Sequence, residues 1–112
     1  MTKIECILRP DRILDVRNVL GSLGIKGMTV TEVIGCGLQK GHTRDDWNTE
    51  ININLLPKTK IEMVVSDGMV DEVVTAIIKI SRTGEIGDGK IFVQPVDDAM
   101  RVRTGERGEN AV

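Results

Sequence analysis

The sequence predicts an α+β fold of the ferredoxin-like sandwich type, in which a sheet carries two helices on one face and the elements follow the order βαββαβ. The spacing of the apolar residues changes from strand-like to helix-like and back, and this order occurs twice with elements of similar length. The 112 residues suit one domain and are too few for two ordinary ones. We therefore expect residues 1–112 to fold as a single domain.

The first half of the chain carries one strand-helix-strand unit. Residues 3–8 form a short apolar run that ends before Pro10, which predicts a strand. The next apolar residues recur every three or four positions, as in an amphipathic helix: Ile13, Val16, Leu20 and Leu23. Gly24 ends this helix. Residues 28–36 then alternate in polarity and are rich in β-branched side chains, which predicts the second strand.

The second half repeats this order. Residues 59–65 predict a strand, Ser66 is a candidate N-cap of a helix that ends near Gly84, and residues 90–93 predict the last strand. Two helices cover only one face of such a sheet, so the other face meets either solvent or another subunit. The many Val and Ile residues of the strands favour a subunit, and we expect an oligomer.

A long connection separates the two halves. Residues 37–56 span about twenty positions, and a connection of that length in a small domain is usually functional or disordered. Its returning arm alternates Ile51, Ile53 and Leu55 with asparagines, which predicts a β extension. The polar tail from Thr104 onward, and residues 105–112 in particular, is expected to fray.

Composition excludes several classes of function. The net charge of −2 and the scarcity of aromatic residues, which are only Trp47 and Phe92, argue against a nucleic-acid reader. The sequence has no apolar run long enough to span a membrane and no signal-peptide core at its N-terminus. Cys6 and Cys36 form no close pair, so a reducing cytoplasm is the expected location.

Glycine residues cluster at 35–41 and at 84–89. Neither cluster has the spacing of a dinucleotide-binding or Walker motif. Glycine allows successive backbone N–H groups to line an anion-binding concavity, so each cluster is either a phosphate site or an ordinary turn. Lys90 adjoins the second cluster, and Arg101 and Arg103 on an extended segment would point the same way toward phosphate oxygens. The alternative is a solvated basic edge strand.

Three single residues are also candidates for a functional role. His42 follows a loop glycine without a partner for a catalytic triad, so we interpret it as a solvated loop residue. Cys36 lacks a neighbouring cysteine or histidine that would activate it, and we interpret it as a small strand-end residue. Trp47 lies among charged residues, where it either anchors a protein partner or folds back on its own loop.

At the level of motifs, the whole chain resembles the PII signal transduction proteins, the trimeric nitrogen regulators. The segments that carry the resemblance are Gly27 to Val33, Gln39 to Thr43, Leu56 to Lys58, Thr83 to Val93 and Arg101 to Glu106. The most specific of these is Gly-Asp-Gly-Lys-Ile-Phe at positions 87–92, with its upstream threonine.

The resemblance implies a homotrimer of ferredoxin-like subunits that binds ATP or ADP between subunits and 2-oxoglutarate beside MgATP. The long loop, called the T-loop and placed here at about 37–56, would then dock on an ammonium transporter, a metabolic enzyme or a transcription regulator. Such a protein is a cytoplasmic regulator of nitrogen metabolism and not an enzyme. It binds no nucleic acid and does not insert into the membrane.

The resemblance also assigns roles to individual positions. The nucleotide would contact Ile7, Thr29, Gly35, Gly37, Leu38, Gln39, Glu62, Val64, Gly87, Asp88, Gly89, Lys90, Arg101 and Arg103. The 2-oxoglutarate pocket would comprise Gly37, Gln39, Lys40, Gly41 and Lys58, with Gln39 also ligating Mg²⁺. The partner-binding loop would comprise Arg44, Asp45, Asp46, Trp47, Asn48, Thr49 and Glu50.

The chain departs from the family pattern at four of these positions or beside them. Leu38 replaces an arginine that contacts nucleotide phosphate in most members, and Trp47 replaces the arginine that plugs an ammonium channel. Ile51 stands where the enterobacterial type carries its uridylylated tyrosine, which excludes that modification here. Thr49 stands where cyanobacterial members carry a phosphorylated serine, so it is a candidate modification site.

Two other functions stay open from the sequence. Leu38 and the unusual loop suit a divergent sensor of adenine-nucleotide energy state, or of another small metabolite, with a different partner. A slow ATPase is the second alternative, for which only His42 and Asp88 are candidate catalytic residues.

Overall fold

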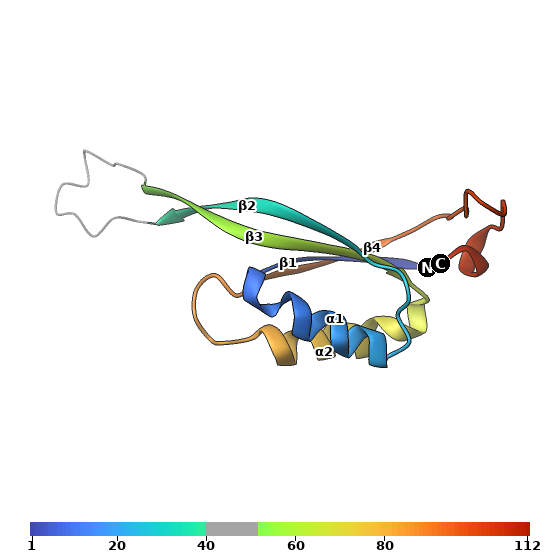
Figure 1. The fold of residues 1–112 in the computed structure, drawn as a ribbon, viewed down its shortest axis with the longest axis horizontal. Helices are drawn as coiled ribbons and strands as arrows, with labels where there is room; N and C mark the ends of the chain where they lie inside the picture. Colours follow the sequence, from blue (N-terminus) through green and yellow to red (C-terminus); the bar gives the residue numbers. More distant parts are fainter. Residues whose placement is uncertain (40–51) are drawn as a thin grey trace.

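The computed structural model describes residues 1–39 and 52–112 and has the predicted order of elements (Figure 1). The strands and helices are β1 (Thr2–Leu8), α1 (Ile13–Ser22), β2 (Thr29–Gln39), β3 (Asn52–Val65), α2 (Val70–Ser81) and β4 (Gly89–Pro95). Short 3-10 turns occupy Pro10–Arg12, Asp67–Met69 and Gly108–Ala111. No helix in the described part of the chain is both long and apolar enough to cross a membrane.

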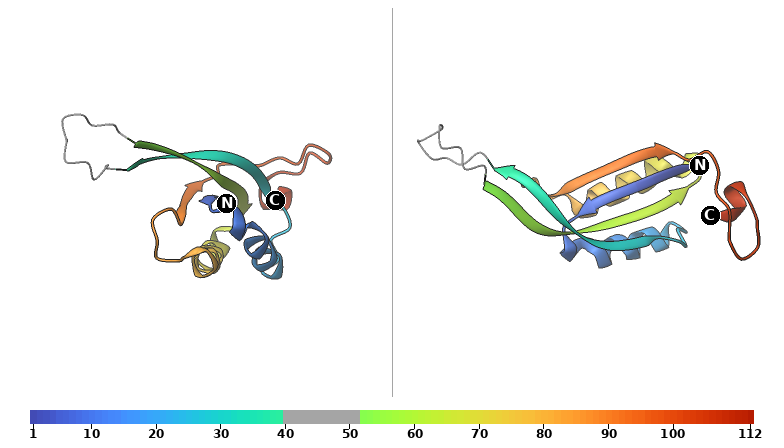
Figure 2. Two further views of the ribbon diagram at one scale, coloured as in Figure 1. Left: turned by 60° about the vertical axis from the view of Figure 1, so that its left-hand side comes forward. Right: turned by 90° about the horizontal axis from the view of Figure 1, so that it is seen from above.

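The four strands form one antiparallel sheet in the order β2-β3-β1-β4, with both helices on the same face (Figures 1 and 2). β1 is central: Cys6 lies opposite Ile61 of β3 and opposite Ile91 of β4. Leu8, at the end of β1, lies opposite Gly89, the first residue of β4. The fold is therefore the predicted ferredoxin-like α+β sandwich.

The core lies between the sheet and the two helices. Because side chains alternate along a strand, every second residue of β1 and β3 faces the helices. The fully buried side chains are Ile4, Cys6, Val16, Leu20, Ile61, Val73 and Ile77. Each large aliphatic side chain contributes about 1.5–3 kcal/mol of stability by leaving water. Burial raises the pKa of the Cys6 thiol to about 12, so this cysteine is a neutral packing residue.

The open face of the sheet carries both charged and apolar side chains. On β1 and β3, Ile4, Ile61 and Val65 face the helices, whereas Ile7 and Val64 lie on the opposite face among charged residues. Lys3 bonds Glu62 at 3.0 Å, and Lys60 bonds Glu62 at 3.0 Å and Glu5 at 3.3 Å. The open face is therefore of mixed character, and the expectation that another subunit covers it stays a prediction.

Further apolar side chains are exposed on the outer strands and on the ribbon that β2 and β3 form. Ile34 is 72% exposed and Leu55 is 65% exposed. On the outer strand β4, Phe92 and Val93 are about half exposed. Phe92 is opposite Glu5 and therefore on the open face, so the apolar surface that a second copy of the chain could cover includes part of that face.

β2 and β3 continue beyond the rest of the sheet as a two-stranded ribbon (Figure 1). Their pairing extends to Gln39 opposite Asn52, so residues 37–39 and 52–56 are strand and not loop. This confirms the β extension of the returning arm and corrects the predicted loop boundaries of 37–56. Hydrogen bonding between the two backbones outweighs the weak β-propensity of glycine and asparagine here. The predictions for 40–51, which include Lys40, Gly41, Thr49 and the rest of the partner-binding loop, lie outside the described residues.

The C-terminal segment projects beyond β4 and folds back on itself, which differs from the predicted frayed tail (Figure 2). Met100 and Arg107 form an isolated β-bridge, and the Gly108 N–H donates to the Ala99 carbonyl at 2.9 Å. The Arg107 guanidinium hydrogen-bonds the Asp98 carboxylate and lowers its pKa. These bonds hold a segment that its polar composition alone predicted to be mobile.

Candidate functional site

The loop between α2 and β4, residues 83–88, has a backbone that requires glycine. Gly84, Gly87 and, at the start of β4, Gly89 have φ angles of 86°, 101° and 108°. Residues with a Cβ rarely adopt such angles. A Cβ on Gly89 would also lie 1.9 Å from the Ile7 carbonyl oxygen, because β1 and β4 pair at this point. The glycine cluster seen in the sequence therefore builds one defined loop shape.

The Asp88 carboxylate lies inside this loop and accepts hydrogen bonds from it. Its Oδ2 accepts from the backbone N–H of Thr83 at 2.8 Å and of Gly84 at 2.9 Å. Its Oδ1 accepts from the Thr83 hydroxyl and, at 3.4 Å, from Arg9 Nε. The hydrogen bonds from Thr83, ahead of those from Gly84 and Arg9, lower the pKa of Asp88 to about 2.

Acid is therefore expected to release the loop at a low pH. A carboxylate with a depressed pKa adds stability above the ordinary value of 3.8, and this contribution is lost as pH falls toward 2. Urea unfolding of wild type and Asp88→Asn measures it: the difference in midpoint present at pH 7 should shrink between pH 4 and pH 2. A difference that stays constant over that range would contradict the hydrogen bonds described for Asp88.

Two cations hold the carbonyl groups of the same loop. Lys58 Nζ donates to the Gly87 carbonyl at 2.6 Å, and Arg9 Nη2 donates to the Ile86 carbonyl at 3.0 Å. Lys58 belongs to the predicted set. Arg9 was not predicted, because no motif or periodicity singles it out; the only signal would be the pairing of Leu8 with Gly89, which places the end of β1 at the loop.

Much of the predicted site lines one cavity of about 490 Å³ at the base of the ribbon. The predicted residues that it brings together are Ile7, Gly35, Gly37, Lys58, Gly87, Gly89 and Lys90. Leu56, Phe92, Ile86 and Cys36 complete its walls. Two ammonium groups above apolar walls suit an anionic ligand that also has an apolar or planar part.

The other predicted residues lie elsewhere in the chain. Thr29, Glu62 and Val64 line a separate cavity of about 420 Å³. Glu62 also takes part in the ion pairs of the open face, and Lys3 and Lys60 lower its pKa. This cavity lies toward the start of β1, since Val64 is opposite Lys3. The sheet therefore separates the predicted nucleotide contacts into two groups.

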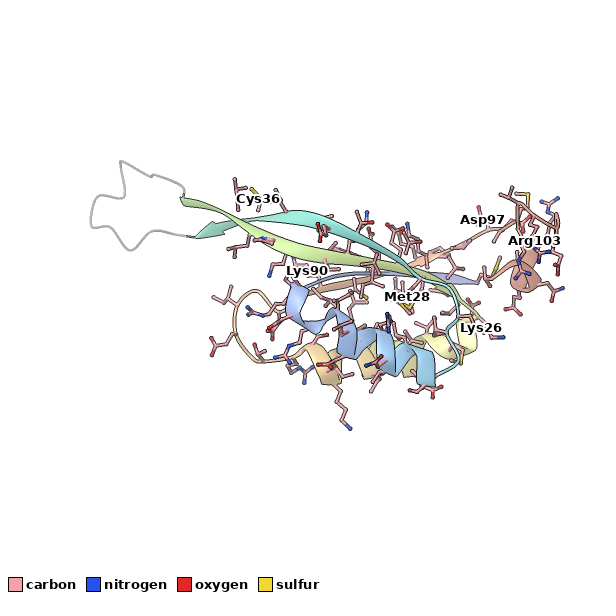
Figure 3. All side chains as sticks on the ribbon, viewed as in Figure 1. Lys26, Met28, Cys36, Lys90, Asp97 and Arg103 are labelled. Carbon is pink, nitrogen blue, oxygen red and sulfur yellow. The ribbon has the colours of Figure 1, made fainter. Side chains whose placement is uncertain are left out.

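Arg101 and Arg103 are also far from the glycine loop. β4 begins opposite Leu8 and ends opposite Thr2, so the segment that follows β4 starts about 20 Å from Lys90. Figure 3 shows Lys90 near the glycine loop and Arg103 on the far side of the molecule. Residues 102–104 form a turn, so the expectation of an extended segment is wrong. Arg101 pairs with Glu106 at 3.6 Å.

For Leu38 and Gln39 the structure defines only the backbone, which pairs with Ile53 and Asn52. The predicted contacts of their side chains with phosphate and Mg²⁺ are therefore outside the described part. Within residues 1–39 and 52–112, no three His, Cys, Asp or Glu side chains gather as metal ligands.

The model of the family described as "Nitrogen regulatory protein P-II" matches residues 1–106. The chain belongs to this family. It is 51% identical to the nitrogen regulatory protein P-II of Haemophilus influenzae over 112 residues, which is the full length of both chains. It is 52% identical to nitrogen regulatory protein P-II 2 of Methanothermobacter thermautotrophicus, covering all of this chain and 97% of that one.

Solved structures of the P-II family support the same assignment. The GlnK-ATP complex of B. subtilis superposes with a TM-score of 0.89 at 39% identity, covering 99% of this chain and 96% of the other. The B. subtilis GlnK structure gives a TM-score of 0.87 with the same identity. The P-II resemblance, the ferredoxin-like fold and a regulatory role in signal transduction are thereby confirmed for this chain.

Proposed function

We propose that this P-II chain binds ATP or ADP in a crevice between two neighbouring copies of itself and reports the occupancy of that crevice to a protein target. The observation that carries the proposal is the division of the predicted contacts. Lys90 and the glycine loop lie at one end of the sheet, whereas Arg101 and Arg103 lie at the other. Since one chain cannot bring these cations around one polyphosphate, a neighbouring copy supplies the second group. The likeness to the B. subtilis GlnK-ATP complex supports nucleotide as the ligand.

The oligomer we propose is a homotrimer. A contact that joins one end of a protomer to the opposite end of the next is heterologous, and repeated copies close into a ring where the rotation between neighbours allows it. Three copies per ring is what the resemblance to P-II proteins implies. Exposed apolar side chains along the sheet edges and the ribbon, such as Ile34 and Phe92, provide surface for such contacts. The Lys3, Glu5, Lys60 and Glu62 network satisfies the charges of the open face within each protomer.

A second ligand, 2-oxoglutarate, is proposed beside the phosphates. Lys58 would pair with one of its carboxylates, and backbone N–H groups from Gly37 to Gly41 would bind the other oxygens, because charge-assisted donors are the strong ones for carboxylates. Gln39 would ligate Mg²⁺ carried by ATP. The cavity that joins Lys58, Gly37 and the glycine loop supports this placement.

The output would pass through residues 44–50 to a transporter, an enzyme or a regulator of nitrogen metabolism. Ordering of the chain from Gly37 to Lys58 by the ligands would shift the population of loop conformations, by no more than their differential affinity for the two states. Thr49 is a candidate modification site in this loop. We propose a cytoplasmic protein that acts as a regulator and not as an enzyme.

A divergent sensor is the second candidate function, because Leu38 replaces a phosphate-binding arginine of most family members. That chain would keep the trimer and the loop but would respond to the ADP to ATP ratio, or to another metabolite, without 2-oxoglutarate.

Titration calorimetry with ATP, ADP and 2-oxoglutarate separates these functions. We expect ATP and ADP to bind, and 2-oxoglutarate to bind only with MgATP present. ATP binding that 2-oxoglutarate leaves unchanged would favour the divergent sensor. No binding of any of the three at millimolar concentration would reject both. Leu38→Arg should tighten ATP binding, since it restores a charge-assisted contact worth about 1.5–3 kcal/mol.

A further inference from the structure

We propose that Asp88, Thr83 and Arg9 form a clasp that holds the loop 83–88 in the shape that receives phosphate, and that Asp88 itself makes no contact with nucleotide. This inference rests on the proposed nucleotide site and concerns the role of one residue in it. The resemblance to P-II proteins implies a direct contact of Asp88 with nucleotide. Its hydrogen bonds assign it another role.

The acceptor capacity of the Asp88 carboxylate is already filled. A carboxylate has two oxygens and about four lone-pair sites. Four donors occupy them: the N–H of Thr83, the N–H of Gly84, the Thr83 hydroxyl and Arg9 Nε. The Thr83 hydroxyl also accepts from the Glu85 N–H at 3.1 Å, which extends the network across the turn. An ionised carboxylate would in addition repel phosphate, so direct contact is unfavourable.

The carbonyl groups of the two residues before Asp88 are held in fixed directions by cations. Arg9 binds the carbonyl of Ile86 and Lys58 binds the carbonyl of Gly87. In a trans peptide the N–H points opposite to the preceding C=O. With both carbonyls directed at Arg9, which follows β1, and at Lys58 of β3, the N–H groups of Gly87 and Asp88 are directed to the other side. Consecutive N–H groups on one side form an anion-binding concavity.

The clasp joins three separate elements at this concavity. Thr83 follows the end of α2, Asp88 precedes β4, and Arg9 follows β1. Fixing the loop before the ligand arrives removes an ordering cost from binding, which is the general effect of preorganisation on affinity. Loss of one member should therefore weaken phosphate binding although no atom that touches nucleotide has been removed.

Three variants test this in the full-length protein, with ATP titrated by calorimetry. Thr83→Val removes the hydroxyl and keeps the shape, and it should lower ATP affinity about tenfold, the size expected for loss of a hydrogen bond to a charged group. Thr83→Ser keeps the hydroxyl and should bind ATP as wild type does. Thr75→Val, on the exposed side of α2, is the matched control and should leave ATP affinity unchanged.

The two possible roles of Asp88 predict opposite changes in ATP affinity for Asp88→Asn. If Asp88 lies against phosphate, removal of its negative charge strengthens ATP binding. If Asp88 instead holds the loop as part of the clasp, the side-chain amide introduced by Asp88→Asn loses the hydrogen bonds from the Thr83 hydroxyl and Arg9, and ATP binding weakens. Tighter ATP binding by Asp88→Asn, or wild-type affinity of Thr83→Val, would overturn the proposal.

Hydrogen exchange of the ligand-free protein keeps this test separate from the proposed function. The amides of 84–88 should exchange faster in Thr83→Val than in wild type or Thr83→Ser, whether or not ATP binds. Equal exchange in all three proteins would overturn the clasp. If these amides exchange faster in Thr83→Val but the wild-type protein binds no ATP, the clasp is retained. In that case the proposed function is rejected, because the loop does not bind nucleotide.

Discussion

Mixing two variants that each bind ATP only weakly is expected to restore high-affinity binding in part. Lys90→Met removes the cation beside the glycine loop, and a variant with both Arg101→Met and Arg103→Met removes those at the opposite end of the protomer. Each lost charge-assisted contact with phosphate removes about 1.5–3 kcal/mol, so each variant alone should bind ATP about ten- to a hundredfold or more weakly.

In mixed oligomers a crevice is intact when one neighbour keeps Lys90 and the other keeps both arginines. Random association of equal amounts in a closed ring gives about a quarter of crevices of this kind, since each neighbour is of the required type half the time. The variants are unfolded together, refolded, and titrated with ATP by calorimetry. High-affinity binding at about a quarter of the wild-type stoichiometry is expected.

The control for this experiment is each variant refolded alone, which should recover no high-affinity site. A mixed sample that also recovers none, although mass spectrometry shows mixed oligomers, would contradict a site shared between copies. In that case the two groups of residues would serve different ligands, or one of them would serve none.

Gly89→Ala is expected to cause the largest loss of stability from a single methyl group, about 3 kcal/mol or more. The new Cβ would lie 1.9 Å from the Ile7 carbonyl oxygen, and the φ angle of 108° strains any residue with a side chain. Backbone on both sides is fixed by the pairing of Leu8 with Gly89, so the clash cannot be relieved by a side-chain rotation. Urea unfolding followed by circular dichroism measures the change.

Gly21→Ala is the matched control for this prediction. Gly21 lies on the exposed side of α1, has no atom within 4 Å of an added Cβ and has no positive φ. Alanine should therefore stabilise the helix by about 0.5–1 kcal/mol. Equal unfolding midpoints for Gly89→Ala and wild type would mean that β1 and β4 do not meet at this point.

The order and type of the elements could be predicted from periodicity, because burial imposes it directly. Val16 and Leu20 recur at helical spacing and both are fully buried. The ends of β2 and β3 could not be predicted in the same way. Residues such as Gly37 and Asn54 disfavour strands when taken singly, and their conformation depends on a partner strand fifteen or more positions away in the sequence.

The glycine loop was predictable from composition, since Gly87 and Gly89 occupy backbone angles that other residues avoid. The residues that hold this loop in place could not be predicted. Arg9 reaches the loop only because β1 ends beside β4, and the role of Asp88 depends on hydrogen bonds that the order of residues does not reveal. The ion pairs of the open face were not predicted, because they join residues of different strands, such as Lys3 and Glu62, whose proximity depends on the register of the sheet.

The ribbon of β2 and β3 connects the cavity at its base to a distant end of the molecule. Gly35 and Gly37 form part of the cavity wall at its base, and the same strand runs on without a break to Gln39, well clear of the helices. When two paired strands rotate together about the cavity, the far end of the ribbon moves further than the residues that line the cavity. In the proposed function, nucleotide binding in the crevice would thus produce a larger displacement at the end of the ribbon, where we propose that another protein binds.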